Sequence, residues 1–197
     1  MKTRLLLSVL LLGLPLCVTA QTKPAEDPET VVLSDTLNYD DVAKTSVFKG
    51  NVILTRGLMR LTADELQVRE DEKGFQHGTA TVSKGKKVTI LEERPENYET
   101  IYAEGNSATY NGETGIVRLI GQSVLIRRVC GKPMDTLRGN IVTYNNKNNT
   151  YYAEGGAKGS QSRVRSVVQA RSKTDNAVEE CRQKYHGKPM PSSIQKK

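Results

Sequence analysis

Apolar and polar residues alternate along this chain in short stretches, and one such stretch recurs. Its first copy covers residues 48–54 (FKGNVIL), in which every second position is apolar or glycine. A second copy covers 119–125 (LIGQSVL), 71 residues later (121 − 50 = 71), and a partial third copy ends at Gly155. Alternation with period two is typical of β-strands with one apolar face. Its repetition predicts an all-β, antiparallel protein built from repeated strand units.

The alternation slips by one residue in the strand after the first copy. Apolar residues occupy odd positions up to Ala63, and the even positions Leu66 and Val68 take over beyond Asp64-Glu65. A shift of one residue would turn every later side chain to the opposite face. The slip therefore predicts a β-bulge or a strand bend at this point.

The apolar faces of these strands predict a shared interior. The residues expected to line it are Val32, Phe48, Val52, Leu54, Leu61, Leu66, Val68, Leu119, Leu125, Leu137, Val142 and Tyr144. In the simplest interpretation they pack against one another and fill the space. The chain has no Trp and only two Phe, however, so its core is lean. A sheet that curls without closing would leave an apolar groove, in which a guest chain gains about 0.8 kcal/mol per CH₂.

Composition divides the chain into four segments. Residues 1–20 have a basic start, an apolar stretch and a small-residue cleavage site, which indicates a signal peptide removed on export. An uncleaved anchor is the alternative. Residues 21–30 are expected to be a flexible leader, 31–171 the β-domain, and 172–197 a basic, disordered tail without apolar pattern.

The net charge and the cysteines of the chain limit the kinds of partner and compartment that it can have. Loss of Lys2 and Arg4 with the signal peptide lowers the formal net charge from +7 to +5 (7 − 2), which favours an acidic partner such as a phosphorylated lipid. Simple solubility explains the same excess, and export argues against nucleic acid. Cys130 and Cys181 remain in an oxidising compartment. A disulfide between them is possible, but sequence separation does not reveal whether they pair.

Catalytic and metal motifs are not found. The chain has no GxSxG, HExxH or CxxC motif and no phosphate-binding glycine loop. Its two histidines are far apart and form no zinc pattern with the cysteines. The sequence predicts no catalytic residue, no metal site and no cofactor, and so a protein that is not an enzyme.

Two segments then indicate a family. Residues 48–52 (FKGNV), followed by 61–68 (LTADELQV), resemble the repeat of the OstA-like family of periplasmic lipopolysaccharide-export bridge proteins. Residues 119–122 (LIGQ) and 137–144 (LRGNIVTY) resemble the repeat as well. The resemblance covers about 31–168, and the predicted signal peptide fits the periplasm.

The resemblance implies a twisted, V-shaped β-jellyroll, open at both ends, that binds the lipid A acyl chains of lipopolysaccharide. It also implies an inner-membrane LptC-like partner, an outer-membrane LptD-like partner and head-to-tail self-association. Unpaired edge strands template such pairing, and the residues expected there are Val31, Leu33, Leu37, Val164 and Val167. Three alternatives remain open: a structural β-fibre with a filled interior, a soluble periplasmic lipid shuttle, and a membrane-anchored LptC-like protein.

Overall fold

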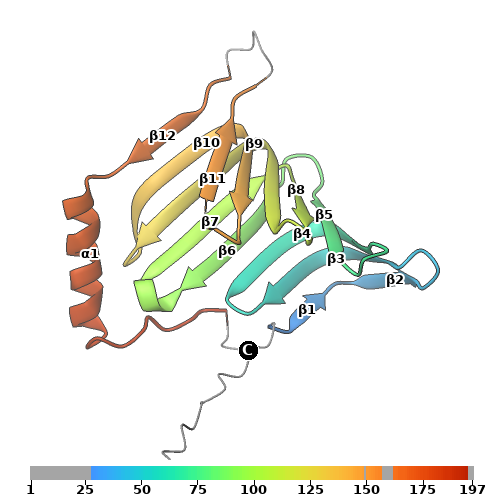
Figure 1. Cartoon of the computed structure of the whole chain (residues 1–197), viewed down its shortest axis with the longest axis horizontal. Helices are drawn as coiled ribbons and strands as arrows, with labels where there is room; N and C mark the ends of the chain where they lie inside the picture. Colours follow the sequence, from blue (N-terminus) through green and yellow to red (C-terminus); the bar gives the residue numbers. More distant parts are fainter. Residues whose placement is uncertain (1–27, 149, 157–161, 195–197) are drawn as a thin grey trace, which may run out of the picture.

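The computed structural model describes residues 28–148, 150–156 and 162–194 (Figure 1). The predicted signal peptide and most of the leader lie outside this range. The described elements are β1 (Thr30–Leu33), β2 (Thr36–Asp40), β3 (Thr45–Arg56), β4 (Met59–Glu70), β5 (Gln76–Thr81), β6 (Val88–Arg94), η1 (Pro95–Asn97), β7 (Glu99–Gly105), β8 (Ser107–Asn111), β9 (Ile116–Val129), β10 (Lys132–Asn145), β11 (Thr150–Glu154), β12 (Arg165–Val168) and α1 (Arg171–Lys184). All strand pairs among them are antiparallel, as predicted.

Four long strands, β3, β4, β9 and β10, bend and run through both walls of a folded sheet. The first wall contains β2, β5, β8 and β11 together with one half of each long strand. The second wall contains β1, β6, β7 and β12 together with the other halves. The result is a V-shaped β-jellyroll whose mouth lies between the hairpin tips of the two walls.

The corner of the V is built twice from the repeated sequence. Gly50 and Asn51 have positive φ of 79° and 46°, and the equivalent Gly121 and Gln122 have 81° and 48°. The pairing register shifts at both places, so each corner is a bulge. The predicted bend is confirmed, although the extra residue of the first corner lies on β3 opposite the slip that the sequence shows on β4. Left-handed backbone costs glycine little, which explains why glycine recurs there.

A side chain from the preceding segment packs on each corner glycine. Asp35 accepts a hydrogen bond from the side chain of Asn51 at 2.9 Å, and its own backbone N–H donates to the carbonyl of Gly50 at 3.0 Å. In the second copy Asn106 takes this place, 71 residues later (106 − 35 = 71), and its N–H donates to the backbone of the second corner. The repeat therefore preserves a corner and the polar residue that covers it.

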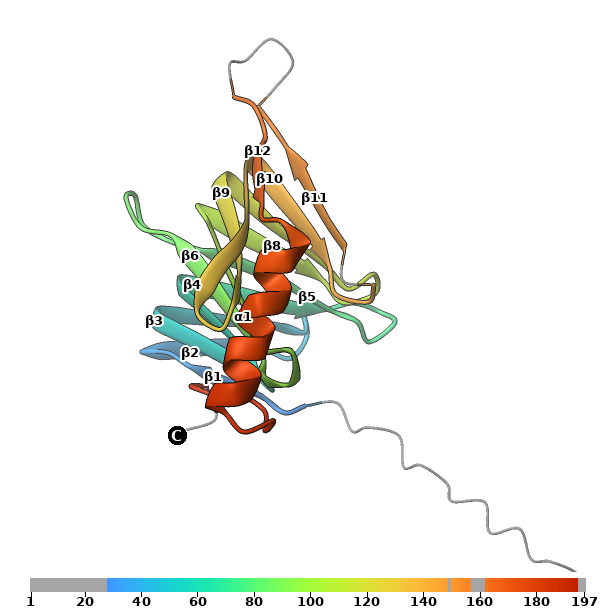
Figure 2. The same cartoon turned by 90° about the vertical axis from the view of Figure 1, so that its left-hand side faces the viewer.

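The described residues 171–194 contain a helix and contacts with distant hairpins, so the expected disordered tail over 172–197 is wrong for this part of it. Helix α1 buries Ala177 and Cys181, and Cys181 forms a disulfide with Cys130 at the tip of the β9–β10 hairpin. Figure 2 shows α1 in front of the ends of the second wall's strands. We call residues 171–194 the C-terminal strap. Composition shows only that this segment has no core of its own; it does not show that distant hairpin tips hold it.

The strap continues along the second wall beyond the helix. Tyr185 stacks on Tyr98 with ring centroids 6.2 Å apart, and the N–H of Met190 donates to the carbonyl of Pro95 at 3.1 Å. The carboxylate of Glu93, only 5% exposed, accepts hydrogen bonds from both Ser192 and Ser193. Burial would raise the pKa of Glu93, but these hydrogen bonds outweigh it and lower the pKa. The strap thus ties the β6–β7 and β9–β10 hairpins together.

The corner gives a direct test of the fold. A Cβ added at Gly50 would lie 2.1 Å from Oδ2 of Asp35, whereas one added at Gly85, which also has positive φ, would meet nothing within 4 Å. Both Gly→Ala changes introduce left-handed strain of about 1–2 kcal/mol. We expect Gly50→Ala to lower the free energy of unfolding by a further ~1–3 kcal/mol because the corner is overpacked, measured by guanidinium denaturation. Equal losses in the two variants would show that the bend does not depend on the contact with Asp35.

Candidate functional site

The apolar inner faces of the two walls meet inside the V. Eleven of the twelve residues predicted to line the interior belong to one contiguous cluster. Its buried members from that prediction are Val52, Leu66, Leu119, Leu125 and Val142, and its half-buried members are Val32, Phe48, Leu54, Leu61, Val68 and Leu137. The structure therefore brings together residues that lie up to 110 positions apart in the chain (142 − 32 = 110).

The interior is less covered towards the β1–β2 end than in the middle. Leu37 pairs with the inner residue Phe48 and is 58% exposed, because β2 pairs only with β3 among the described strands. Val52 lies on β3 like Phe48, on the other side of the bend, and is fully buried. The apolar surface thus runs from a closed centre to an open end of the sheet.

Several inner residues were not predicted. They come mainly from β5 to β8 and comprise Ala63, Ala80, Val82, Val88, Ile90, Ile101, Ala103, Ala108, Tyr151 and Ala153. The short strands β5 to β8 carry no glycine-centred repeat, and alanine is a weak indicator of a core face. Period-two alternation in residues 88–91 and 101–103 was the one available signal.

A belt of charged residues lies above the apolar cluster on the inner face of the second wall. Arg127 donates hydrogen bonds to Glu99 and Asp135, both at 2.6 Å. Arg94 donates to Glu92 at 2.8 Å and lies 3.9 Å from Glu99. Alternation places these residues on the same face as Ile90, Ile101 and Leu125, but nearer the hairpin tips. The inner wall thus changes from apolar to ionic as it approaches the mouth.

Tyr144, the twelfth predicted residue, lies at the mouth. Its hydroxyl oxygen accepts a hydrogen bond of 2.9 Å from Nη2 of Arg94, which comes from the opposite wall. Its ring stacks on Tyr151 with centroids 4.9 Å apart. Burial raises the pKa of Tyr144 to about 12, so the phenol stays protonated at neutral pH. The residue expected to line an apolar face therefore forms a polar contact across the V.

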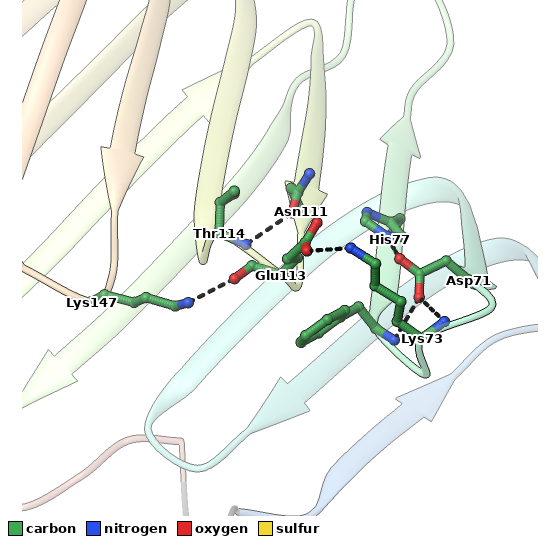
Figure 3. Close-up of polar contacts among 8 residues, drawn as sticks. Asp71, Lys73, His77, Asn111, Glu113, Thr114 and Lys147 are labelled. Carbon is green, nitrogen blue, oxygen red and sulfur yellow. Dashed lines mark hydrogen bonds and ion pairs between the residues drawn. The ribbon is translucent and has the colours of Figure 1, made fainter.

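The rim of the first wall is held by polar contacts between successive turns. Figure 3 shows Lys73, in the β4–β5 turn, reaching Glu113 in the β8–β9 turn at 2.9 Å. Lys147, in the β10–β11 turn, donates to the backbone carbonyl of the same Glu113 at 2.6 Å. At the first of these turns, His77 of β5 contacts Asp71 at 2.7 Å and lowers the pKa of that carboxyl. Three adjacent turns are thus joined by exposed, salt-sensitive contacts.

The two outer edges of the folded sheet expose apolar side chains. All five residues predicted for the edges are exposed: Val31, Leu33 and Leu37 at one end, and Val164 and Val167 at the other. Tyr39 and Val168 are also exposed and were not predicted. Strands β1, β2, β11 and β12 each pair on one side only among the described strands. Each end therefore offers an apolar edge.

Neither a metal site nor a membrane-spanning helix is found among the described residues. They hold no group of three or more His, Cys, Asp or Glu that could ligate a metal ion. No helix in the described part of the chain combines the length and apolar character needed to cross a bilayer.

Comparison with known proteins identifies the family. The model of the family described as "LptA/(LptD N-terminal domain) LPS transport protein" matches residues 31–150. The chain belongs to this family. It therefore has a role in lipopolysaccharide transport, and the resemblance inferred from the repeats is confirmed. No curated protein matches the chain.

A solved structure with the same fold belongs to an LptA homologue. It is LptH from Pseudomonas aeruginosa, described as the LptA-homologous periplasmic component of the lipopolysaccharide transport device. It is 21% identical, with a TM-score of 0.62 over 73% of this chain and 96% of that chain. The match confirms the β-jellyroll. The C-terminal strap lies outside the segment that matches the LptA/LptD family model.

Proposed function

We propose that this protein binds the lipid A acyl chains of lipopolysaccharide between its two walls and bridges the inner and outer membranes in the periplasm. The observation that carries the proposal is the continuous apolar cluster inside an open V, within a chain of the lipopolysaccharide-transport family. Each acyl CH₂ buried there contributes about 0.8 kcal/mol. Acyl chains thus have a favourable path, whereas sugars and phosphates stay in water.

Bridging is supported by the two exposed apolar edges. An unpaired strand at each end of the sheet templates pairing with another chain. A contact between β1–β2 of one molecule and β11–β12 of the next is heterologous, so it does not close and extends into a row. The same edges suit partners that present a jellyroll of this family, such as an LptC-like protein at the inner membrane and an LptD-like protein at the outer membrane.

The competing function is that of a structural fibre, whose interior is filled by its own side chains. Five of the predicted lining residues are buried against one another, which favours it. The half-buried residues towards the β1–β2 end favour the groove, because their side chains keep surface that a guest can cover. The two functions differ in whether lipid binds at all.

Lipid binding is tested with the two phenylalanines of the chain. Phe48 packs against the inner cluster, whereas Phe75 is 37% exposed in the β4–β5 turn. We expect Phe48→Asp to weaken binding of purified lipopolysaccharide at least tenfold, because it places a charge on the path of the acyl chains. Phe75→Asp is the matched control and should bind like the wild type. Circular dichroism confirms that both variants are folded, and Phe48→Leu should retain binding. Equal affinities for Phe48→Asp and Phe75→Asp would contradict the groove.

Self-association is tested at the β1 edge. Leu33 is 54% exposed on β1, and Val42 is 97% exposed in the β2–β3 turn, outside any strand. A lysine on an edge strand opposes pairing with another sheet. We expect wild-type protein to form larger species as its concentration rises in sedimentation velocity, and Leu33→Lys to stay monomeric. Val42→Lys should behave like the wild type. A wild-type protein that is monomeric throughout, or identical behaviour of the two variants, would refute pairing through this edge.

A further inference from the structure

One hydrogen bond crosses the mouth of the V between residues that lie 50 positions apart in the chain. Arg94 ends β6 in the second wall, and Tyr144 lies next to the end of β10 in the first wall. Both side chains project from the inner faces of their walls. Their contact therefore spans the space through which any chain lying inside must connect to a head group outside.

Acidic neighbours on the second wall orient the guanidinium of Arg94 towards Tyr144. Glu92 accepts from Nε at 2.8 Å, and Glu99 lies 3.9 Å from Nη1, which leaves Nη2 directed at Tyr144. Glu99 also binds Arg127, which in turn binds Asp135, so the orientation is supported by a connected network. A planar guanidinium held at several nitrogens is pre-organised for its remaining partner. On the opposite wall, stacking on Tyr151 holds the ring of Tyr144.

The equivalent place in the first repeat holds residues whose side chains cannot form this hydrogen bond. The segment 137–144 repeats 61–68 with an offset of 76 (144 − 68 = 76), so Tyr144 corresponds to Val68. In the sheet, Tyr144 pairs with Tyr151, whereas Val68 pairs with Gly78. Two tyrosines thus stand where the first repeat has a valine and a glycine. The hydrogen bond between Arg94 and Tyr144 therefore belongs to the C-terminal half of the V.

We propose that Arg94 and Tyr144 form a latch that must open for the acyl chains of an anionic lipid to pass through the C-terminal half of the groove. The inference rests on the proposed function. In the proposed complex, the acyl chains lie inside the V and the head group lies outside. The bonds that join them therefore pass through the mouth, where the latch lies. Passage therefore requires the hydrogen bond to break.

The chemistry of the latch favours lipids with a phosphorylated head group. Arg94 gives up a phenol oxygen when the latch opens, and a phosphate oxygen is a stronger, charge-assisted acceptor for a guanidinium. An anionic head group in the mouth therefore compensates for the broken bond. A lipid with the same chains but without phosphates has to open the latch without this compensation. Arg94 is in this sense a positioning residue that determines specificity.

Tyr144→Phe is the variant that tests the latch. It removes the hydroxyl but keeps the ring that stacks on Tyr151. Tyr102→Phe is the matched control, because the Tyr102 hydroxyl also donates a hydrogen bond, to Glu104, but on the outer face of β7. The distance across the mouth is measured by electron–electron double resonance between labels at Glu96 and Asn148, attached through unnatural amino acids so that the disulfide stays intact. We expect a broader and longer distribution for Tyr144→Phe than for the wild type or Tyr102→Phe.

The role in lipid passage is tested by stopped-flow binding of two probes, lipid A and its dephosphorylated form. In the wild type and in Tyr102→Phe, we expect lipid A to associate about tenfold faster than its dephosphorylated form. A factor of this size corresponds to about one charge-assisted hydrogen bond. In Tyr144→Phe the association rate of the dephosphorylated probe should rise, and the ratio of the lipid A rate to this rate should fall.

The outcomes separate the latch from the proposed function. If both probes bind and Tyr144→Phe leaves the ratio and the label distances unchanged, the latch is wrong and the groove stands. If neither probe binds to wild-type protein, the proposed function fails and the role of the latch fails with it.

Discussion

The bend of four long strands at two glycine-containing bulges is the constraint on which the rest of the structure depends. Without it, the inner faces of β3, β4, β9 and β10 would belong to one flat sheet with an exposed apolar side. The positive φ at Gly50 and Gly121 folds that sheet so that its apolar faces oppose each other. The side chains of Asp35 and Asn106 occupy the space that a Cβ would need. Interior, mouth and open ends all follow from this fold.

The two rims of the mouth are stabilised by different chemistry. Exposed ion pairs and turn hydrogen bonds connect the turns of the first wall, and such contacts contribute little individually and weaken with salt. The second wall is tied by the C-terminal strap through a disulfide, a tyrosine stack and the buried carboxylate of Glu93. This difference predicts that, if the mouth opens, the first wall moves and the second wall keeps its geometry. The charged belt lies on the second wall.

The sequence repeats made the strands, the bend and most of the apolar lining predictable. Period-two alternation in residues 48–54 and 119–125 predicted strands, and the slip at Asp64 predicted the bend, because both are local properties of a pleated strand. Most of the apolar lining could be read from the same alternation. The residues that it missed lie mainly in β5 to β8, where alanines are common and the glycine-centred repeat is missing. Tyr144 was expected on an inner face and lies there, but its bond to Arg94 depends on how two distant walls approach.

The contacts that hold the helix of the strap could not be predicted with the same means. Residues 171–184 have a largely polar sequence, and the helix is held by a cysteine and a tyrosine whose partners lie in other hairpins. Such tertiary contacts override local composition. Whether Cys130 and Cys181 pair was equally undecidable, because pairing depends on the distance between their Cα atoms, which is 5.5 Å in the folded chain.

The central claim, a continuous lipid path between the walls, is tested most directly by site-specific photo-crosslinking in cells that make lipopolysaccharide. The photoreactive residue is placed at Phe48 in one repeat, at Leu119 in the other, and at Lys49, whose side chain reaches Glu65 and not the inner cluster. The account predicts lipopolysaccharide adducts at Phe48 and Leu119 and none at Lys49. No adduct at either inner position, in folded protein with the crosslinker incorporated, would contradict it and favour a filled, structural interior.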